Sequence, residues 1–329
     1  MPQYIVYGLR LNAESHIPGL VPLCHPQPFP ADIQVYLGEK PSCQIEPLPY
    51  YQSRSQLDNG QPQLQVWKLA SGGFQFRYGD GTQFWLSDRG AQIWATWPED
   101  LTLEDTCTYF LGPILAFVLN LRGFTCLHAS AIVIENQAIG FCGRAGAGKS
   151  TTAAYLAQQG FPILTDDVLT LQESNGQFWV IPAYPRVRLW NASVTGLFGH
   201  PEHLPRIVPS HPTWDKRFLD LTQPGYQFHS QPVPLRKVYV LKRRDSNLSA
   251  PHLQPQSCQD SLLSLLDQAY TKRLLSKTSH ARQFLTLGRL VQQIPVSQLT
   301  LPDRLVDLGQ LEELLLQDLN QPAAIATYG

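Results

Sequence analysis

Residues 143–150 read Gly-Arg-Ala-Gly-Ala-Gly-Lys-Ser, and this stretch constrains the fold of the chain more than any other. It matches the pattern G-x-x-x-x-G-K-[ST], which is typical of loops that bind nucleotide phosphates. Its three glycines allow backbone turns with positive φ and a close approach to a ligand. Consecutive N–H groups can then point inward and form a nest for phosphate oxygens. The pattern therefore predicts a nucleotide-binding loop.

Each residue type in the loop has an expected part. Lys149 brings a positive charge to the β- and γ-phosphates, and the hydroxyl of Ser150 can bind Mg²⁺. The backbone around these two residues is expected to hold the remaining phosphate oxygens. We expect contacts with ATP along Gly143, Gly146, Ala147, Gly148, Lys149, Ser150 and Thr151.

The flanks of the loop agree with this prediction. An apolar run over 138–142 suits a buried strand, and residues 149–159 contain no Pro or Gly and suit a helix. Gly160 follows at the place where a helix commonly ends. The positive end of the helix dipole would lie at the phosphate site. An ordinary glycine-rich turn before a helix is the alternative.

A second group of charged residues follows soon after the loop. The short apolar segment 161–165 leads into Asp166 and Asp167. Strands of a parallel α/β sheet collect ligands at their carboxyl ends, so these carboxylates are expected near the phosphate loop. One carboxylate would hold Mg²⁺ and the other would accept a proton from an attacking hydroxyl, in an order left open. The alternative is an Asp-Asp turn that caps a strand end.

Other candidates are single residues of ambiguous meaning. His128 opens the strand expected beside the loop strand, where it is either structural or close to the transferred phosphate. Arg186, Arg188, Lys216 and Arg217 are the basic residues best placed to neutralise developing charge. We favour Lys216 and Arg217 as possible phosphate or substrate contacts.

Composition excludes several classes of protein. The 329 residues carry a net charge of −1, which favours neither nucleic acid nor an anionic membrane as partner. Six cysteines without metal-site spacing indicate a reduced, cytoplasmic chain, and the N-terminus does not resemble a signal peptide. The apolar stretch 109–121 is too short to span a bilayer and predicts a buried helix, begun by a Thr102–Asp105 capping box.

The distribution along the chain of Pro and Gly, which interrupt helices and strands, predicts three structural regions. Residues 1–100 alternate apolar with polar residues between many turns and are expected to form a β-rich N-terminal domain. The alternating runs 73–78 and 83–86, separated by Gly79-Asp80-Gly81-Thr82, predict a hairpin. Residues 101–245 would form the nucleotide-binding core, ending in a final core strand over 237–241 and followed by a linker. Residues 246–329 show helical periodicity over 262–269 and 284–294, with a third helix expected over 309–318, and these helices would form a helical cover.

Three segments together resemble the catalytic core of HPr kinase/phosphorylase, a bacterial protein-serine kinase: His128-Ala129-Ser130, Gly143 to Ser150, and Thr165-Asp166-Asp167. The resemblance covers about residues 124–190. It implies an α/β fold with a P-loop catalytic domain, like that of HPr kinase and ATP-dependent phosphoenolpyruvate carboxykinase. The chain as a whole is most similar to HPr kinase-like proteins associated with peptide natural-product gene clusters. The glycine- and asparagine-containing segment that follows the HPr kinase core is not found, and residues 1–100 do not resemble its regulatory domain.

The resemblance implies an ATP- and Mg²⁺-dependent kinase that phosphorylates a hydroxyl, with a serine of a peptide or protein as the expected acceptor. Catalysis would fall to Asp166, Asp167, His128 and Lys149, and metal binding to Ser150 and the two aspartates. Homo-oligomers are possible. Two alternatives remain open from the residues, namely a kinase of a small metabolite and a regulatory module that binds ATP without transferring phosphate.

Overall fold

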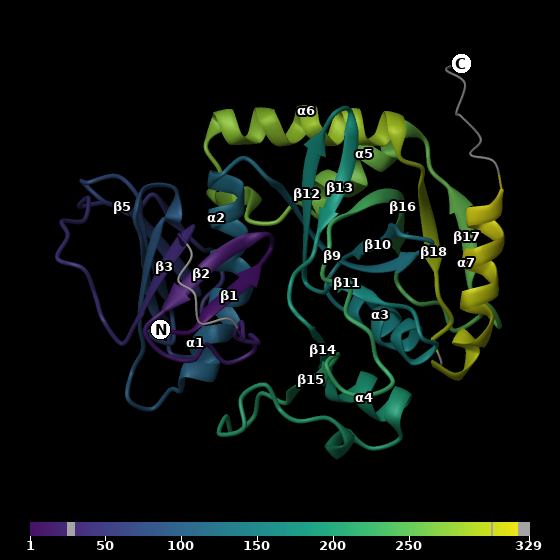
Figure 1. Cartoon of the computed structure of the whole chain (residues 1–329), viewed down its shortest axis with the longest axis horizontal. Coiled ribbons are helices and arrows are strands. Elements are labelled where there is room, and N and C mark those ends of the chain that lie inside the picture. The colour runs from purple at the N-terminus through teal and green to yellow at the C-terminus, as the bar shows by residue number, and fades with distance from the viewer. Residues whose placement is uncertain (25–29, 304, 322–329) are drawn as a thin grey trace. The chain divides into compact units, whose positions relative to one another are not determined.

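In the computed structural model, two large β-sheets and several helices form a mixed α/β fold (Figure 1). The structure describes residues 1–24, 30–303 and 305–321. The chain divides into two units, Met1–Gly123 with Thr271–Ser276, and Phe124–Tyr270 with Lys277–Gly329. The first boundary thus follows Gly123 instead of residue 100, because the apolar helical segment expected in the core belongs to the first unit.

The first unit is built on an eight-stranded sheet. The strand order is β1 (Gln3–Val6), β2 (Leu9–Ala13), β3 (Ile33–Leu37), β8 (Gln92–Thr96), β7 (Gln83–Leu86), β6 (Phe74–Tyr78), β5 (Leu64–Lys68) and β4 (Tyr51–Gln52). β3 runs parallel to both of its neighbours, β2 and β8, whereas the other neighbouring strands are antiparallel. The expected hairpin is present as β6 and β7, and the Asp80 carboxylate accepts a hydrogen bond from the Thr82 N–H in its turn.

A buried helical segment packs against this sheet. It runs through α1 (Leu103–Tyr109), a π-helical turn over Phe110–Ile114 and α2 (Leu115–Leu121). The predicted capping box of Thr102 and Asp105 is present at its start. Pro113, which has no backbone N–H to donate, lies inside the π turn. Among the described residues, no helix is both long and apolar enough to cross a membrane.

The second unit is organised around β9 (Thr125–Ile134). β10 (Gln137–Gly143) pairs with it antiparallel on one side, and β11 (Ile163–Thr165) and β12 (Val168–Ser174) pair antiparallel on the other. Since β10 and β11 are both antiparallel to β9, they run in the same direction. Their carboxyl ends therefore lie at the same edge of the sheet, as expected for the glycine-rich loop and the aspartate pair.

The rest of this sheet differs from expectation. β13 (Gln177–Ile181) and β16 (Val233–Leu241) continue it, with β10 and β16 parallel. The prediction that 237–241 is the last core strand was wrong, because β18 (Val296–Thr300) pairs parallel with β16, and β17 (His252–Pro255) pairs with β18. Alternation in these two short strands is weak, and β17 lies in the polar segment that suggested a linker.

Helices pack on both faces of the second sheet. Alternate residues of β9 and β10 enter two separate clusters of buried side chains, as the two-residue period of a strand requires. One cluster includes α3 (Lys149–Gln158) and α7 (Leu311–Asn320), and the other includes α5 (Cys258–Asp267) and α6 (Lys277–Gln293). The three predicted C-terminal helices are thus present, with Gly309 in the 3₁₀ turn Leu305–Gln310 before α7.

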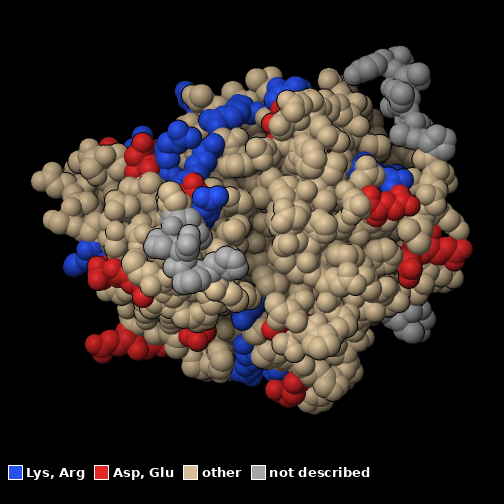
Figure 2. All heavy atoms as spheres, in the orientation of Figure 1, with Lys and Arg blue, Asp and Glu red and all other residues tan. Residues whose placement is uncertain are grey.

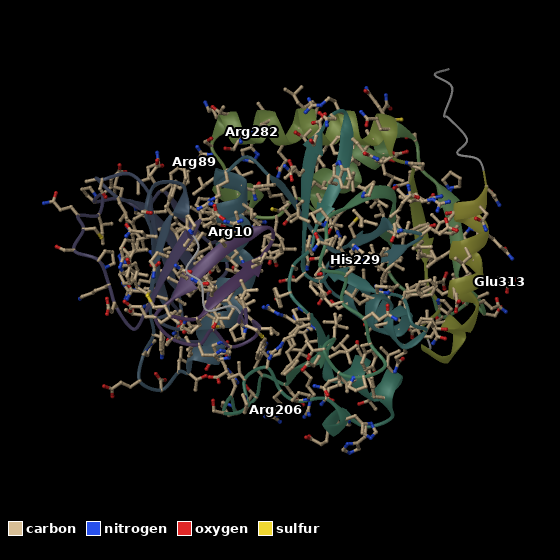
Figure 3. The ribbon with its side chains drawn as sticks, in the orientation of Figure 1. Arg10, Arg89, Arg206, His229, Arg282 and Glu313 are labelled. Carbon is tan, nitrogen blue, oxygen red and sulfur yellow. The ribbon has the colours of Figure 1, made fainter. Side chains whose placement is uncertain are left out.

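A two-stranded ribbon completes the second unit. It pairs β14 (Arg186–Trp190) with β15 (Lys216–Asp220), and α4 (Asn191–Phe198) and a short 3₁₀ turn lie between the two strands in sequence. Arg206, labelled in Figure 3, is in the same connecting segment. On the face drawn in Figure 2, uncharged residues cover most of the surface, which agrees with the low content of charged residues, 16%.

Candidate active site

The glycine-rich loop joins β10 to α3 and requires glycine at particular positions. Gly146 and Gly148 have φ of 80° and 103°, where other residues are strained. A side chain at Gly143 would meet the Leu241 carbonyl oxygen at 2.7 Å, so β16 approaches the loop too closely for any other residue. The helix ends as expected, because the N–H groups of Gly160 and Phe161 donate to the carbonyls of Ala157 and Leu156.

Lys149 is buried at the start of α3. Its ammonium group donates to the carbonyl oxygens of Gly143 (2.7 Å) and Arg144 (3.2 Å), so the side chain folds back across the loop. Burial lowers the pKa of Lys149, and the charges of Asp167 and Asp166 partly oppose that effect. The lysine charge is therefore held within electrostatic reach of both aspartates.

Asp166 is fixed by two donors in the interior. Its side chain is only 3% exposed, and one carboxylate oxygen accepts from the Ser130 hydroxyl at 2.6 Å. The other oxygen accepts from the Arg188 backbone N–H at 2.8 Å. Strands β9 and β14 thus fix the orientation of this carboxylate. Such bonds to a charged acceptor are short and strong.

Asp167 lies in the tight turn between β11 and β12 and faces a different set of groups. Its φ of 71° is unusual for a residue other than glycine, and the Val168 N–H donates to the Asp166 carbonyl across it. A strained backbone at such a place is common in functional sites. Because of this turn, the two aspartates do not simply alternate between the opposite faces of one extended strand.

The carboxylate of Asp167 contacts three side chains. His128 Nε2 is 3.3 Å from Oδ1, and the Tyr270 hydroxyl donates to Oδ2 at 3.4 Å. Arg188 Nη1 is 3.9 Å from Oδ2. Burial alone would raise the pKa of Asp167, but the hydrogen bond from His128 and the positive charges of Arg188 and Lys216 outweigh it and lower the pKa well below its usual range. Asp167 is therefore firmly ionised.

Lys216 and Arg217 are neighbours on β15 with different surroundings. Burial lowers the pKa of Lys216, and the charges of Asp167 and Asp166 partly oppose that effect, so its ammonium group lies within electrostatic reach of the aspartate pair, with the Trp190 ring centroid 5.5 Å away. Arg217 is almost fully buried and bonded to Glu202 and Asp215. The structure brings Lys216 to the candidate site. It does not bring Arg217 there, because adjacent side chains of a strand point to opposite faces.

The donor set of Ser150, Asp166 and Asp167 consists of oxygen atoms, the ligands that Mg²⁺ prefers. The described part of the chain holds no cluster of three or more His, Cys, Asp or Glu side chains arranged for a metal ion. Ser150 is half-buried in the first turn of α3, and Thr151 next to it shares a hydrogen bond of 2.8 Å with Ser193.

Several residues near the site were missed or dismissed from the sequence. Ser130 and Tyr270 contact the aspartates. Ser130 was named only as part of the segment His128-Ala129-Ser130 and was given no role, and nothing in the local pattern marks Tyr270. The basic triplet 242–244, which follows β16, is not among the residues predicted for the site. In the structure Arg244 lies beside Gly148, where an added Cβ would be 3.2 Å from the guanidinium. Lys242 and Arg243 line a cavity next to the loop. The run of three consecutive basic residues directly after a core strand was the sequence signal that could have placed them near the site.

No family model and no curated protein matches the chain. Among solved structures, the Hpr(Ser) kinase/phosphatase from Coxiella burnetii aligns with 16% sequence identity and a TM-score of 0.32. The alignment covers 59% of this chain and 94% of that protein.

Proposed function

We propose that this protein is an ATP- and Mg²⁺-dependent kinase that transfers the γ-phosphoryl group to a hydroxyl. The observation that carries the proposal is the meeting of a glycine-rich loop, its buried lysine and two differently held carboxylates at one edge of a sheet. A module that only bound a nucleotide would need the loop. It would not need a strained, ionised aspartate coupled to a histidine.

The cationic groups are assigned to the phosphates. Lys149 releases the two loop carbonyls and binds the β- and γ-phosphates, while Lys216 approaches from β15. Lys149 is buried and Lys216 is half-buried, which makes their interaction with phosphate stronger than it would be in water. The N–H groups between Gly146 and Thr151 complete the phosphate site at the start of α3.

The two aspartates receive different roles. Asp166 is 3% exposed and held by Ser130 and Arg188, so it is suited to orient a metal-bound water or the metal itself, together with Ser150. Asp167 is more accessible, with 19% of its side chain exposed, and it contacts His128, which is 39% exposed. Asp167 is therefore the proposed proton acceptor, and His128 passes the proton toward solvent. Mg²⁺, when bound, neutralises charge that develops on the phosphates.

The reaction follows from this placement. The acceptor hydroxyl oxygen forms a bond to the γ-phosphorus, and the bond from that phosphorus to the β–γ bridging oxygen breaks, which releases ADP. The hydroxyl proton goes to Asp167. Positioning and charge neutralisation supply most of the rate, as is usual for phosphoryl transfer. The acceptor enters from the exposed side of His128.

A serine of a peptide or protein is the preferred acceptor, and its support is the resemblance of the three sequence segments to HPr kinase. No residue of the described site selects a peptide over a small metabolite. The experiment is incubation of the purified chain with γ-labelled ATP, Mg²⁺ and a panel of peptides, proteins and small alcohols, with Lys149→Ala as control. Label on an acceptor, lost in the variant, supports a kinase. Tight ATP binding without transfer to any acceptor would favour the regulatory module.

A further inference from the structure

A cavity of about 640 Å³ lies beside the glycine-rich loop within the second unit. The loop forms one wall through residues 143–147, and the end of β16 with the residues after it forms another. The last turns of α5 close the third side through Leu263, Ser264, Asp267 and Gln268. The roles proposed above use only the phosphate end of the loop and leave this cavity without a function.

The size and lining of the cavity point to a small organic group. A volume of several hundred Å³ is typical of ligand pockets and is much larger than a phosphate group requires. Val240, Leu241 and Leu263 supply apolar surface. Asp267 and Gln268 add a carboxylate and an amide to the same wall, where they can bind hydroxyl and amino groups.

One ion pair connects the loop to the helix at the rim of this cavity. Arg144 Nε lies 3.8 Å from the Asp267 carboxylate, and both side chains are exposed, at 88% and 51%. An exposed pair of this length contributes little stability. It can therefore separate and close again at low cost, and the planar guanidinium of Arg144 can stack on an aromatic ring.

The cavity is also joined to the aspartate site through the backbone. The Gln268 carbonyl accepts a hydrogen bond of 2.8 Å from the His128 N–H, and the Tyr270 N–H donates to Cys126. Tyr270 follows Gln268 of the cavity wall by two positions in the sequence, and its hydroxyl donates to Asp167. The cavity and the aspartate pair therefore flank the same loop, at a separation fixed by the bonds of 268–270 to β9.

We propose that this cavity binds the nucleoside of the phosphate donor, with a purine base against Leu263 and under Arg144. Asp267 accepts hydrogen bonds from the ribose hydroxyls or from an amino group of the base. The inference rests on the proposed function, because it places the nucleoside of the same nucleotide whose phosphates occupy the loop. This placement predicts that the protein recognises the phosphate donor through its nucleoside as well as through its phosphates.

The test compares binding of Mg·ATP with binding of Mg·tripolyphosphate, which lacks the nucleoside, by titration calorimetry. The cavity variants are Leu263→Ser and Asp267→Asn. Leu285→Ser on α6 and Glu313→Gln on α7 are matched controls, since Leu285 and Glu313 are exposed helical residues that do not line the cavity. Figure 3 labels Glu313 on its helix.

Each cavity variant should bind Mg·ATP about 3- to 10-fold more weakly, which is the loss of one modest contact, and should bind Mg·tripolyphosphate as the unaltered chain does. The control variants should bind both probes normally. Equal affinity of the unaltered chain for the two probes, or unchanged ATP affinity in both cavity variants, would overturn the nucleoside assignment while leaving the loop as a phosphate site. Binding of neither probe would overturn both proposals.

Discussion

Replacement of Ser130 by alanine tests whether the buried carboxylate of Asp166 depends on its strand neighbour. Ser130 is completely buried on β9 and donates its hydroxyl to Asp166 at 2.6 Å. Ser130→Ala removes that donor and leaves Asp166 with the Arg188 N–H. Little water can take the place of the hydroxyl, because Asp166 is 3% exposed.

The magnitude follows from the charge of the acceptor. A hydrogen bond to a charged group contributes about 1.5–3 kcal/mol to stability, roughly twice the value of a neutral pair. Each kcal/mol lowers Tm by about 2–4 °C in a domain of 150–250 residues, so Ser130→Ala should lower Tm by about 3–12 °C. Phosphate transfer should also decrease, because Asp166 loses its fixed orientation.

The assay is calorimetric unfolding together with transfer from labelled ATP at a temperature where every variant is folded. Ser130→Thr keeps the hydroxyl on a strand, where a β-branched residue is favoured, and should restore most of both properties. Ser297→Ala on β18 is the control, because it removes another buried serine from the same sheet. If Ser130→Ala and Ser297→Ala have equal and small effects, the bond to Asp166 is unimportant and the reasoning fails.

Three further predictions concern single charged groups. Lys149→Ala should abolish transfer and weaken Mg·ATP binding in titration calorimetry, since it removes the charge at the phosphates, and binding at normal affinity would contradict its role. Lys216→Met should lower the rate of phosphate transfer with little change in Tm. Arg217→Met should lower Tm with little change in the transfer rate per folded molecule. The reverse result would show that Arg217, and not Lys216, contributes to the site. Asp167→Asn should cut transfer about 10²–10⁴-fold. It should also flatten the loss of stability in acid, because an aspartate with a lowered pKa stabilises the folded state above its usual pKa of about 3.9 and loses that effect as pH falls below it.

The elements predicted most reliably from the sequence were those with a local cause. The hairpin of β6 and β7, the capping box before α1 and the end of α3 at Gly160 each depend on residues within a few positions of one another. The strand before the loop and the helix after it are present for the same reason. The short strands β17 and β18 were missed because tertiary pairing with β16, not local pattern, makes them strands.

Within the candidate site, the sequence indicated which residues to expect. It did not indicate on which face of a strand each side chain lies, or which distant residues it contacts. Neither the choice between Lys216 and Arg217 nor the difference between Asp166 and Asp167 can be read from adjacent positions. The first depends on which face of β15 each side chain takes, and the second on a turn with positive φ. Tyr270 is 103 positions from Asp167, so only the return of α5 toward β9 could reveal their contact.

If the proposed mechanism holds, the balance of positive and negative charges in the site explains how Asp167 can act as the proton acceptor. Lys149, Lys216 and Arg188 lie within electrostatic reach of the two carboxylates, so the three positive charges exceed the two negative ones before a phosphate arrives. This excess attracts phosphate, and it also keeps Asp167 too acidic to be an effective base. Nucleotide phosphates would compete for the same cations, which must raise the pKa of Asp167 toward its usual range. The proton acceptor therefore becomes more basic when the phosphoryl donor is bound, which ties activation of the hydroxyl to the presence of the donor.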